Sequence, residues 1–310
     1  RDEWVTAEGD ATITDGQPPP AEHEIDEALV RRLLTAQHPD LAGRPLRYVT
    51  DGWDNVTYRL GDDLAVRLPR RAVAAELFDS EQRWLPVLAR RVDVAVPEPV
   101  RAGHPGEGYP WSWSVVRWID GTPVDEAPLD PTEAAPFGRF LADLHGPAPD
   151  DAPRNPYRGI PLRAKGESLA IRWDRLDTLD VGLAVPVDAV RSAWAAVVDT
   201  TVDLPAGWTH SDLHPKNLVG DAGRLAGVID WGDLGVADPA LDLAAAWMLF
   251  PPAAHDDLWA AYGGISEATH ARARGWAIFF GSILLDTAVD GEDTFGRIGR
   301  QTLERVVGES

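Results

Sequence analysis

The sequence of 310 residues contains no cysteine. Disulfide bridges, zinc–thiolate sites and cysteine nucleophiles are therefore excluded. A chain without cysteine suits a reducing compartment, so we expect a cytoplasmic protein. The first residues, Arg1-Asp2-Glu3-Trp4, show no basic region followed by an apolar run, so we expect no secretory signal in the chain as it stands.

Long apolar runs and basic charge are also scarce. No apolar run approaches the ~20 residues that a transmembrane helix needs, so we expect no membrane partner. Only 29 residues are Lys or Arg, against 50 Asp or Glu, and the formal charge is −21. Such a surface repels nucleic acids and anionic membranes and attracts cationic ligands. The acidic charge either keeps the protein soluble or favours a cationic substrate, and composition leaves both interpretations open.

Three regions follow one another along the chain. Residues 1–22 are polar, end in a run of prolines and lack apolar periodicity, which predicts a disordered acidic tail. Residues 23–119 are rich in strand patterns and are expected to form an N-terminal lobe. Residues 120–310 are mostly helical and are expected to form a C-terminal lobe. The pattern predicts an α+β fold of two lobes, with a short linker near Ile119-Asp120-Gly121.

The periodicity of apolar residues predicts the individual elements. In the first lobe it predicts a helix, three antiparallel strands, a second helix and a further strand pair, at 24–37, 46–49, 56–60, 64–68, 72–90, 100–102 and 112–119. In the second lobe it predicts helices at 132–145, 187–199, 239–249, 255–262, 267–288 and 294–307. One hairpin over 217–229 interrupts these helices, and residues 146–162, rich in Pro, Asp and Arg, are expected to form an extended loop.

One segment carries a combination of residues that suits phosphoryl transfer. In His210-Ser211-Asp212-Leu213-His214-Pro215-Lys216-Asn217, an acid and an amide lie five residues apart in a polar loop. Asp230 ends the next strand, and the hairpin between them would bring it back beside Asn217. A carboxylate can accept a substrate hydroxyl's proton, and hard oxygen ligands can hold Mg²⁺ against nucleotide phosphates. The segment therefore predicts a phosphoryl-transfer centre.

This segment resembles the aminoglycoside phosphotransferase and choline kinase group of the protein-kinase-like superfamily. His-Ser-Asp-Leu-His-Pro-Lys-Asn is similar to that group's catalytic loop, and Ile229-Asp230-Trp231-Gly232 to its metal-binding motif. The resemblance implies a protein-kinase-like fold of two lobes, with ATP or GTP and Mg²⁺ as co-substrate and cofactor. It implies that Asp212 is the catalytic base and that Asn217 and Asp230 bind Mg²⁺. The lobe of residues 23–119 would bind nucleotide, and residues 120–310 would hold the catalytic loop and the acceptor site.

Four residues within and after these motifs have other expected roles or depart from the family pattern. Asp238 and Asp242, which follow the metal-binding motif, are expected to brace the loop rather than touch substrate. Ser211 stands where the family often has glycine, and Lys216 where a small residue is common. Lys216 either contacts the γ-phosphate or is solvated.

The family's basic residue on the third strand, which grips the α- and β-phosphates, corresponds to Arg67. Arginine binds phosphate through two parallel hydrogen bonds, so the role is chemically available, although many relatives carry lysine there. Its expected partner is a glutamate on the next helix, either Glu76 or Glu81. Glu81 lies within the apolar stripe of that helix and Glu76 lies to one side, so we choose Glu81. The stripe is predicted at Val73, Leu77, Trp84 and Leu88, with Pro86 expected to kink or end the helix.

Two backbone segments complete the expected nucleotide site. The loop 50–55, with the single glycine Gly52, would cover the phosphates. Residues 114–121 resemble the hinge between the lobes, where the Arg117 carbonyl and the Ile119 amide would hydrogen-bond the purine. The sequence does not distinguish ATP from GTP.

The acceptor is expected to be a small molecule bound in the helical half. Asp233, Asp286 and Asp290 could bind the ammonium groups of an aminoglycoside, and Asp286 and Asp290 are spaced to share a helix face. The first hypothesis is a kinase of an antibiotic, and a kinase of a primary metabolite of choline or sugar type is the alternative. A non-catalytic ligand-binding protein and a protein kinase are the competing classes. Whether the chain is a monomer or a dimer stays open.

Overall fold

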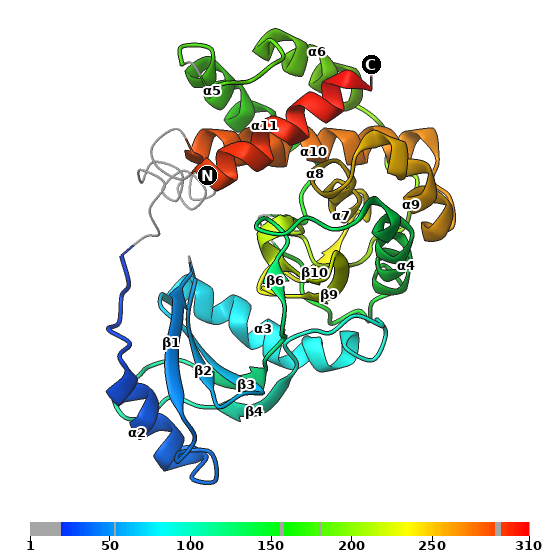
Figure 1. Cartoon of the computed structure of the whole chain (residues 1–310). Coiled ribbons are helices and arrows are strands. Elements are labelled where there is room, and N and C mark those ends of the chain that lie inside the picture. The colour runs from blue at the N-terminus through cyan, green and yellow to red at the C-terminus, as the bar shows by residue number, and fades with distance from the viewer. Residues whose placement is uncertain (1–19, 53, 156–157, 180, 289–292, 310) are drawn as a thin grey trace. The chain divides into compact units, whose positions relative to one another are not determined.

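The computed structural model describes residues 20–52, 54–155, 158–179, 181–288 and 293–309. The chain forms two compact units (Figure 1). Among the described residues, the first unit contains 20–121 together with Ala226–Gly232, and the second contains Thr122–Leu225 and the residues from Asp233 onward. The predicted tail of residues 1–22 lies almost wholly outside the described residues. Glu22, at its end, donates its backbone N–H to the carbonyl of Arg70 at 2.9 Å.

The first unit is built on one antiparallel sheet in the order β1-β2-β3-β5-β4. Its strands and helices are α2 (Glu27–Gln37), β1 (Leu46–Asp51), β2 (Asn55–Leu60), β3 (Leu64–Pro69), α3 (Ala72–Leu88), β4 (Pro99–Gly103) and β5 (Trp113–Arg117). Asp26 caps α2 by accepting a hydrogen bond from the Leu29 amide at 2.7 Å, which explains why the helix starts later than its apolar pattern predicts.

The central strand of this sheet, β3, is buried along its whole length. Its residues Val66 and Leu68 join a hydrophobic core with the buried face of α2. The opposite face meets α3, where the Arg67 guanidinium lies 5.8 Å from the Phe78 ring centroid. Because both faces of β3 are covered, a charged residue on this strand must find its partner inside the protein.

Residues Ala226–Gly232 group with the first unit, whereas the sequence pattern placed them in the C-terminal half. Gly227 forms a parallel bridge with Ala95, and the Val228 amide donates to the Ala95 carbonyl at 2.9 Å. Gly227 also leaves room for Ile119, whose side chain a Cβ at this position would overlap. Ala95 lies in a segment without apolar periodicity, so these contacts could not be predicted from the sequence.

The second unit is mostly helical. Its helices are α4 (Ala134–Leu144), α5 (Gly166–Leu176), α6 (Val187–Val197), α7 (Ala240–Leu243), α8 (Ala245–Leu249), α9 (His255–Tyr262), α10 (Glu267–Thr287) and α11 (Asp293–Gly308), with 3₁₀ turns η1 (Pro131–Glu133), η2 (Leu162–Lys165), η3 (Pro215–Asn217) and η4 (Pro252–Ala254). Its strands are β6 (Thr122–Pro123), β7 (Gly207–Thr209), β8 (Leu218–Asp221), the start of β9 (Arg224–Val228) and β10 (Gly235–Ala237). The α+β class is confirmed.

The helix α10 forms the centre of the second unit and packs against α5, α6, α7, α8 and α11 (Figure 1). A short pair of antiparallel strands, β7 and β10, lies directly before the segment 210–217, with Thr209 opposite Gly235. The sequence pattern predicted neither this pair nor α5, and it merged α7 and α8 into one helix. Within the described residues, no helix combines the length and apolar character that crossing a membrane requires.

Candidate active site

The backbone of the segment 210–217 is held in place by one buried carboxylate. Asp242, on α7, accepts hydrogen bonds from the amides of His210 at 2.7 Å and Ser211 at 2.8 Å. Its second contact is with Nε2 of His145, at 3.2 Å. A buried carboxylate that accepts several such bonds is strongly stabilised, and it fixes the groups that donate to it. Asp242 therefore has the bracing position expected from the sequence.

Asp238, the other expected brace, acts at a different place. It accepts two hydrogen bonds from the Arg272 guanidinium, at 2.6 and 3.2 Å, and one from the Ala240 amide at 3.1 Å. The last bond caps the start of α7. Arg272 also binds Asp203, so this network ties α7 to α10 and to the segment before β7. It supports the site from a distance.

Ser211 adopts a left-handed backbone conformation, with φ +72°. Glycine reaches this region without strain, which gives a physical reason for the glycine that the family often has there. The Ser211 hydroxyl lies 2.8 Å from the Thr209 hydroxyl, which in turn donates to the Gly235 carbonyl. Compared with glycine, the serine strains the backbone at this position but adds a buried hydrogen bond.

Replacing Ser211 by glycine sets these two effects against each other. Relief of the backbone strain should stabilise the protein by about 1 kcal/mol, and loss of one buried hydrogen bond should cost about 1 kcal/mol. We expect Ser211→Gly to change the free energy of unfolding by less than about 1 kcal/mol. Ser211→Ala, which keeps the strain and loses the bond, should be the less stable variant. Chemical denaturation of both variants measures the difference, and equal stabilities would contradict this account of Ser211.

Asp212 is partly exposed and is surrounded by groups that stabilise its negative charge. Nδ2 of Asn217 donates to its carbonyl at 2.9 Å and to its Oδ2 at 3.1 Å. Nε2 of His214 lies 3.5 Å from Oδ2, and the Arg158 guanidinium donates to Oδ1 at 3.2 Å. Burial alone would raise the pKa of Asp212, but His214, Arg158 and His210 outweigh it and hold that pKa well below its usual range. The carboxylate is therefore ionised at neutral pH.

The two expected metal ligands belong to different units, Asn217 to the second and Asp230 to the first. The bonds of Asn217 described above all use its Nδ2, which leaves Oδ1 as the atom for a ligand. Asp230 has a left-handed φ of +59°, and its side chain is 53% exposed. A strained backbone at an exposed carboxylate is characteristic of functional positions. Hard oxygen donors of this kind suit Mg²⁺.

Arg67 and Glu81 form a buried ion pair in the first unit. Their side chains are 9% and 2% exposed, and the second Arg67 nitrogen lies 3.5 Å from Asp230. Burial disfavours the charge on Arg67, but Glu81 and Asp230 outweigh it and raise the pKa of Arg67. Burial raises the pKa of Glu81, against the opposing effect of Arg67. Arg67 therefore stays charged and lies between two carboxylates.

The choice of Glu81 over Glu76 agrees with this contact, although the predicted stripe was partly wrong. Val73 is exposed, whereas Phe78 is buried and faces the sheet. The buried face of α3 consists of Ala74, Ala75, Phe78, Glu81, Trp84, Leu85 and Leu88. Pro86 lies inside the last turn, and the helix ends two residues later.

The loop that contains Gly52 is braced by two arginines that sequence reasoning missed. Arg70 donates to the Gly52 carbonyl at 2.9 Å, and Arg71 donates to Asp54 at 2.7 Å. The Gly52 amide donates to the Asn55 carbonyl at 2.8 Å, which closes the turn. The adjacent pair Arg70-Arg71 was the available signal, since basic residues directly after β3 can order the loop opposite.

The expected hinge lies at the end of β5. The Arg117 amide donates to the Glu98 carbonyl at 3.2 Å, and the Trp118 amide donates to the Asp63 carbonyl at 2.9 Å. Ile119 follows in an irregular segment and is half-buried. The purine contacts of the Arg117 carbonyl and the Ile119 amide stay predictions.

The acidic residues expected to bind the acceptor are placed differently from one another. Asp286 is buried, with its carboxylate 3.6 Å from Arg172 and 3.2 Å from Arg175. Asp233 accepts a hydrogen bond from Nδ2 of Asn155 at 2.5 Å. Asp290 lies outside the described residues. Asp286 is therefore not an exposed acid available to ammonium groups. Its arginine partners were missed because the sequence analysis did not predict α5, the helix that carries them.

Arg158 is the residue beside Asp212 that sequence reasoning missed. It lies in the predicted loop 146–162, and its amide donates to Oδ1 of Asn155 at 2.9 Å. The only available signal was the arginine content of that loop.

Lys216, which the sequence analysis left as either a γ-phosphate contact or a solvated residue, lies over the Phe295 ring, with Nζ 4.2 Å from the ring centroid.

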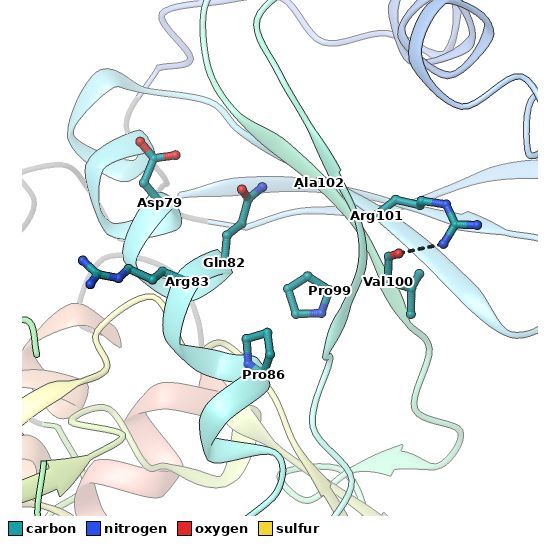
Figure 2. Close-up of a pocket in the computed structure, with 8 residues that line it drawn as sticks. All are labelled: Asp79, Gln82, Arg83, Pro86, Pro99, Val100, Arg101 and Ala102. Atoms are coloured by element: carbon teal, nitrogen blue, oxygen red, sulfur yellow. Dashed lines mark hydrogen bonds between the residues drawn. The ribbon is translucent and has the colours of Figure 1, made fainter. Parts of the chain in front are cut away.

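A hollow of about 360 Å³ on the first unit is lined by none of the residues that the sequence analysis assigned to nucleotide, metal or acceptor binding. Figure 2 shows Pro86 from α3 and Pro99 from β4 lying next to each other within it. Arg101 donates to the Val100 carbonyl at 2.9 Å at one side, and Asp79 and Arg83 extend from α3 at the other (Figure 2). It is a surface feature between α3 and β4, separate from Arg67 and Glu81.

The buried pair between Arg67 on β3 and Glu81 on α3, with an acid and an amide five residues apart in a helical unit, fits a phosphotransferase of protein-kinase-like type. Residues 45–276 match the phosphotransferase enzyme family (APH), and the protein belongs to this family. It is similar to a homoserine kinase of Granulibacter bethesdensis, 30% identical over 71% of this chain and 69% of that protein. A homoserine kinase of Methylocella silvestris is 25% identical over 74% of each chain.

Solved structures show the same fold. The GDP complex of wild-type aminoglycoside 2'-phosphotransferase-IIIa superposes with a TM-score of 0.64 at 17% identity, over 92% of this chain and 99% of that one. A macrolide 2'-phosphotransferase of Brachybacterium faecium gives 0.57 at 23% identity, over 90% and 98%. Together with the family match, these comparisons identify the protein as a small-molecule kinase.

Proposed function

We propose that the protein transfers the γ-phosphate of Mg²⁺-bound ATP or GTP to a hydroxyl group of a small molecule. The observation that carries the proposal is the setting of Asp212. Its carboxylate is ionised and partly exposed, and it is held by Asn217 and Arg158 at 3.1 and 3.2 Å. A rigid, ionised carboxylate at the surface of the helical unit suits the alignment of an acceptor hydroxyl.

The proposed reaction assigns a defined task to Asp212. The acceptor oxygen forms a bond to the γ-phosphorus, and the bond from that phosphorus to the β-phosphate's oxygen breaks, so the nucleoside diphosphate leaves. Asp212 accepts the hydrogen bond of the hydroxyl and then its proton. Because the pKa of Asp212 is lowered, it is a weak base that orients the hydroxyl and takes the proton late. Such a role is enough for a transition state with little bond formation to the acceptor.

Nucleotide binding is proposed to rest on Arg67, Asp230 and Asn217. Arg67 would bind the α- and β-phosphates, and the pair with Glu81 would keep its guanidinium in position. Asp230 and Asn217 would hold Mg²⁺, which supplies charge neutralisation for the phosphates when bound. In the described part of the chain, no three His, Asp or Glu residues cluster as a metal site. A Mg²⁺ ion that keeps nucleotide oxygens and waters as ligands does not need such a cluster.

Binding of the anionic nucleotide has to overcome repulsion by the net charge of the protein, which is −21. We therefore expect nucleotide binding to depend steeply on Mg²⁺. In a thermal-shift measurement, ATP or GTP with Mg²⁺ should raise the melting temperature, and either nucleotide with EDTA should have much less effect. Bound nucleotide at about 100 times its Kd stabilises by about 2.7 kcal/mol. The comparison of ATP with GTP assigns the preferred nucleotide.

Two acceptor classes follow from the similar proteins. The solved structures are named for aminoglycoside and macrolide phosphotransferases, which supports an antibiotic acceptor. The relatives similar in sequence are named homoserine kinases, which supports a small hydroxyl metabolite. The buried position of Asp286 favours the second class, because that carboxylate is already paired with two arginines.

The experiment that tests the function is a phosphoryl-transfer screen read by mass shift. Antibiotics, hydroxy amino acids, choline and sugars are offered with each Mg²⁺-nucleotide, and wild type is compared with Asp212→Ala. Transfer to one class by wild type, with loss in the variant, supports the proposal. Equal behaviour of both proteins with every acceptor, together with no Mg²⁺-nucleotide binding, would leave a ligand-binding protein without transferase activity.

A further inference from the structure

The guanidinium of Arg158 is the group nearest to Asp212 whose position the kinase chemistry does not explain. Its N–H donates to Oδ1 of Asp212 at 3.2 Å, and its side chain is 20% exposed. The Arg158 carbon CZ lies 5.3 Å from the ring centroid of Phe280 on α10. A planar guanidinium over an aromatic ring and beside a carboxylate is held in a defined orientation while part of it remains open to solvent.

The loop that carries Arg158 is fixed by hydrogen bonds to the segment after the metal-binding motif. Asn155 is buried, and its Oδ1 accepts from the Arg158 amide while its Nδ2 donates to Asp233. The Gly159 amide donates to the Asn155 carbonyl at 2.8 Å, and the Val236 amide donates to the Pro153 carbonyl, also at 2.8 Å. Arg158 is thus positioned by the backbone around it and does not depend on Asp212 alone.

The surroundings of Arg158 contain a second cation as well as the carboxylates of Asp212 and Asp233. Nζ of Lys165 lies 4.9 Å from the ring centroid of Phe279, and the Phe279 and Phe280 rings are in contact, with centroids 5.5 Å apart. Asp286, which the sequence offered as a ligand for ammonium groups, is already paired with two arginines on α5. A cationic acceptor group placed beside Arg158 would be repelled by the guanidinium charge, whereas an anionic group would be attracted.

We propose that Arg158 binds an anionic group of the acceptor, a carboxylate in the first instance, so that the substrates are short hydroxy acids, including hydroxy amino acids. This inference rests on the proposed kinase function and specifies its substrate class. The hydroxyl group would bind Asp212 and the carboxylate would bind the neighbouring Arg158, which places the two substrate groups a few ångströms apart. Asp212 keeps Asn217 and His214 as partners when Arg158 turns to the acceptor.

The alternative role of Arg158 is only to position Asp212. The two roles predict different kinetic effects, because loss of an acceptor contact raises KM for that acceptor, whereas misplacement of the base lowers kcat for every acceptor. Matched acceptors separate them. Each hydroxy acid is paired with its carboxamide, which has nearly the same shape and no charge.

The experiment measures kcat and KM for these pairs with wild type, Arg158→Gln and Arg158→Lys. Wild type should prefer the acid to its amide by about 10- to 100-fold in kcat/KM, the usual value of a charge-assisted hydrogen bond. Arg158→Gln should raise KM for the acid by a similar factor, leave KM for the nucleotide unchanged and remove the preference. Arg158→Lys should restore part of it. Arg163→Gln, at an exposed arginine paired with Asp199, is the matched control and should behave as wild type.

Three results would overturn the inference. Acid and amide could be equal substrates of wild type, or Arg158→Gln could lower kcat equally for both with KM unchanged. Preferred transfer to a neutral or polycationic acceptor, independent of Arg158, would also reject it. In each of these cases the protein still transfers phosphate, so the proposed kinase function stands. Absence of both Mg²⁺-nucleotide binding and Asp212-dependent turnover rejects the kinase function, and the inference with it.

Discussion

Asp212→Asn is expected to lower the rate of phosphoryl transfer by about 10² to 10⁴, the usual effect of removing a general base. The substitution keeps the size of the side chain but removes the charge that Arg158 and His214 contact. It also removes the carboxylate that we propose as the acceptor of the substrate's proton. KM for the nucleotide should stay within about twofold of wild type, because Asp212 is assigned to the acceptor. Initial-rate kinetics with a saturating acceptor measure both quantities.

The control for this variant is Asp221→Asn, at the exposed last residue of β8. It changes the net charge by the same amount and should keep the wild-type rate. Thermal shift with Mg²⁺-nucleotide shows whether Asp212→Asn is folded and competent to bind. A variant that binds nucleotide and retains more than about a tenth of the rate would exclude Asp212 as the base.

The lowered pKa of Asp212 also fixes the sign of its effect on stability. The folded value lies below the unfolded value of about 3.9, so the stabilisation is present above pH ~4 and is lost as pH falls through the folded value. Asp212→Asn should therefore cost stability at neutral pH and much less in strong acid. The same shift keeps Asp212 ionised in mildly acidic solution, so its protonation should not limit the rate at pH 5.

The contact between Asp212 and Asn217 could be predicted because the two residues lie within a short stretch of sequence. Asp212 and Asn217 are five residues apart, and the structure joins them directly. Arg158 could not be predicted, because its place beside Asp212 depends on backbone pairing between Pro153 and Val236. Pro153 and Val236 lie far apart in the sequence, so no local pattern indicates that they pair. The loop that carries Arg158 also lacks apolar periodicity.

Helix periodicity likewise identified shared faces without showing what packs against them. The apolar period of α3 identified Glu81 as a buried acid, although the stripe itself was displaced and Val73 proved exposed. For α10, spacing placed Asp286 on a helix face but could not say what covered that face. The covering helix, α5, escaped prediction because its apolar residues include Ile171, which is 67% exposed. A period shows which residues share a face, and only tertiary packing decides whether that face meets solvent.

Arg67→Met is expected to lower the free energy of unfolding by about 3 to 5 kcal/mol, the usual cost of breaking a buried ion pair by removing one partner. The variant leaves Glu81 in the core of the first unit, with its side chain 2% exposed and its charge uncompensated. It also removes the residue assigned to the nucleotide phosphates, so Mg²⁺-nucleotide should no longer raise the melting temperature. Chemical denaturation and thermal shift on the same protein measure the two losses.

The double variant Arg67→Met/Glu81→Leu separates stability from function. Replacing both charges by apolar residues of similar size is often neutral or stabilising, so the double variant should recover most of the lost stability while nucleotide binding stays absent. Glu76→Gln, at an exposed glutamate on the same helix, should match wild type in both measurements. In Arg67→Met alone, Glu81 has a raised pKa, so its penalty is present at neutral pH and shrinks as pH falls towards about 4.3. If the double variant regains nucleotide binding along with stability, Arg67 serves the fold only, and the phosphates must be held by other residues.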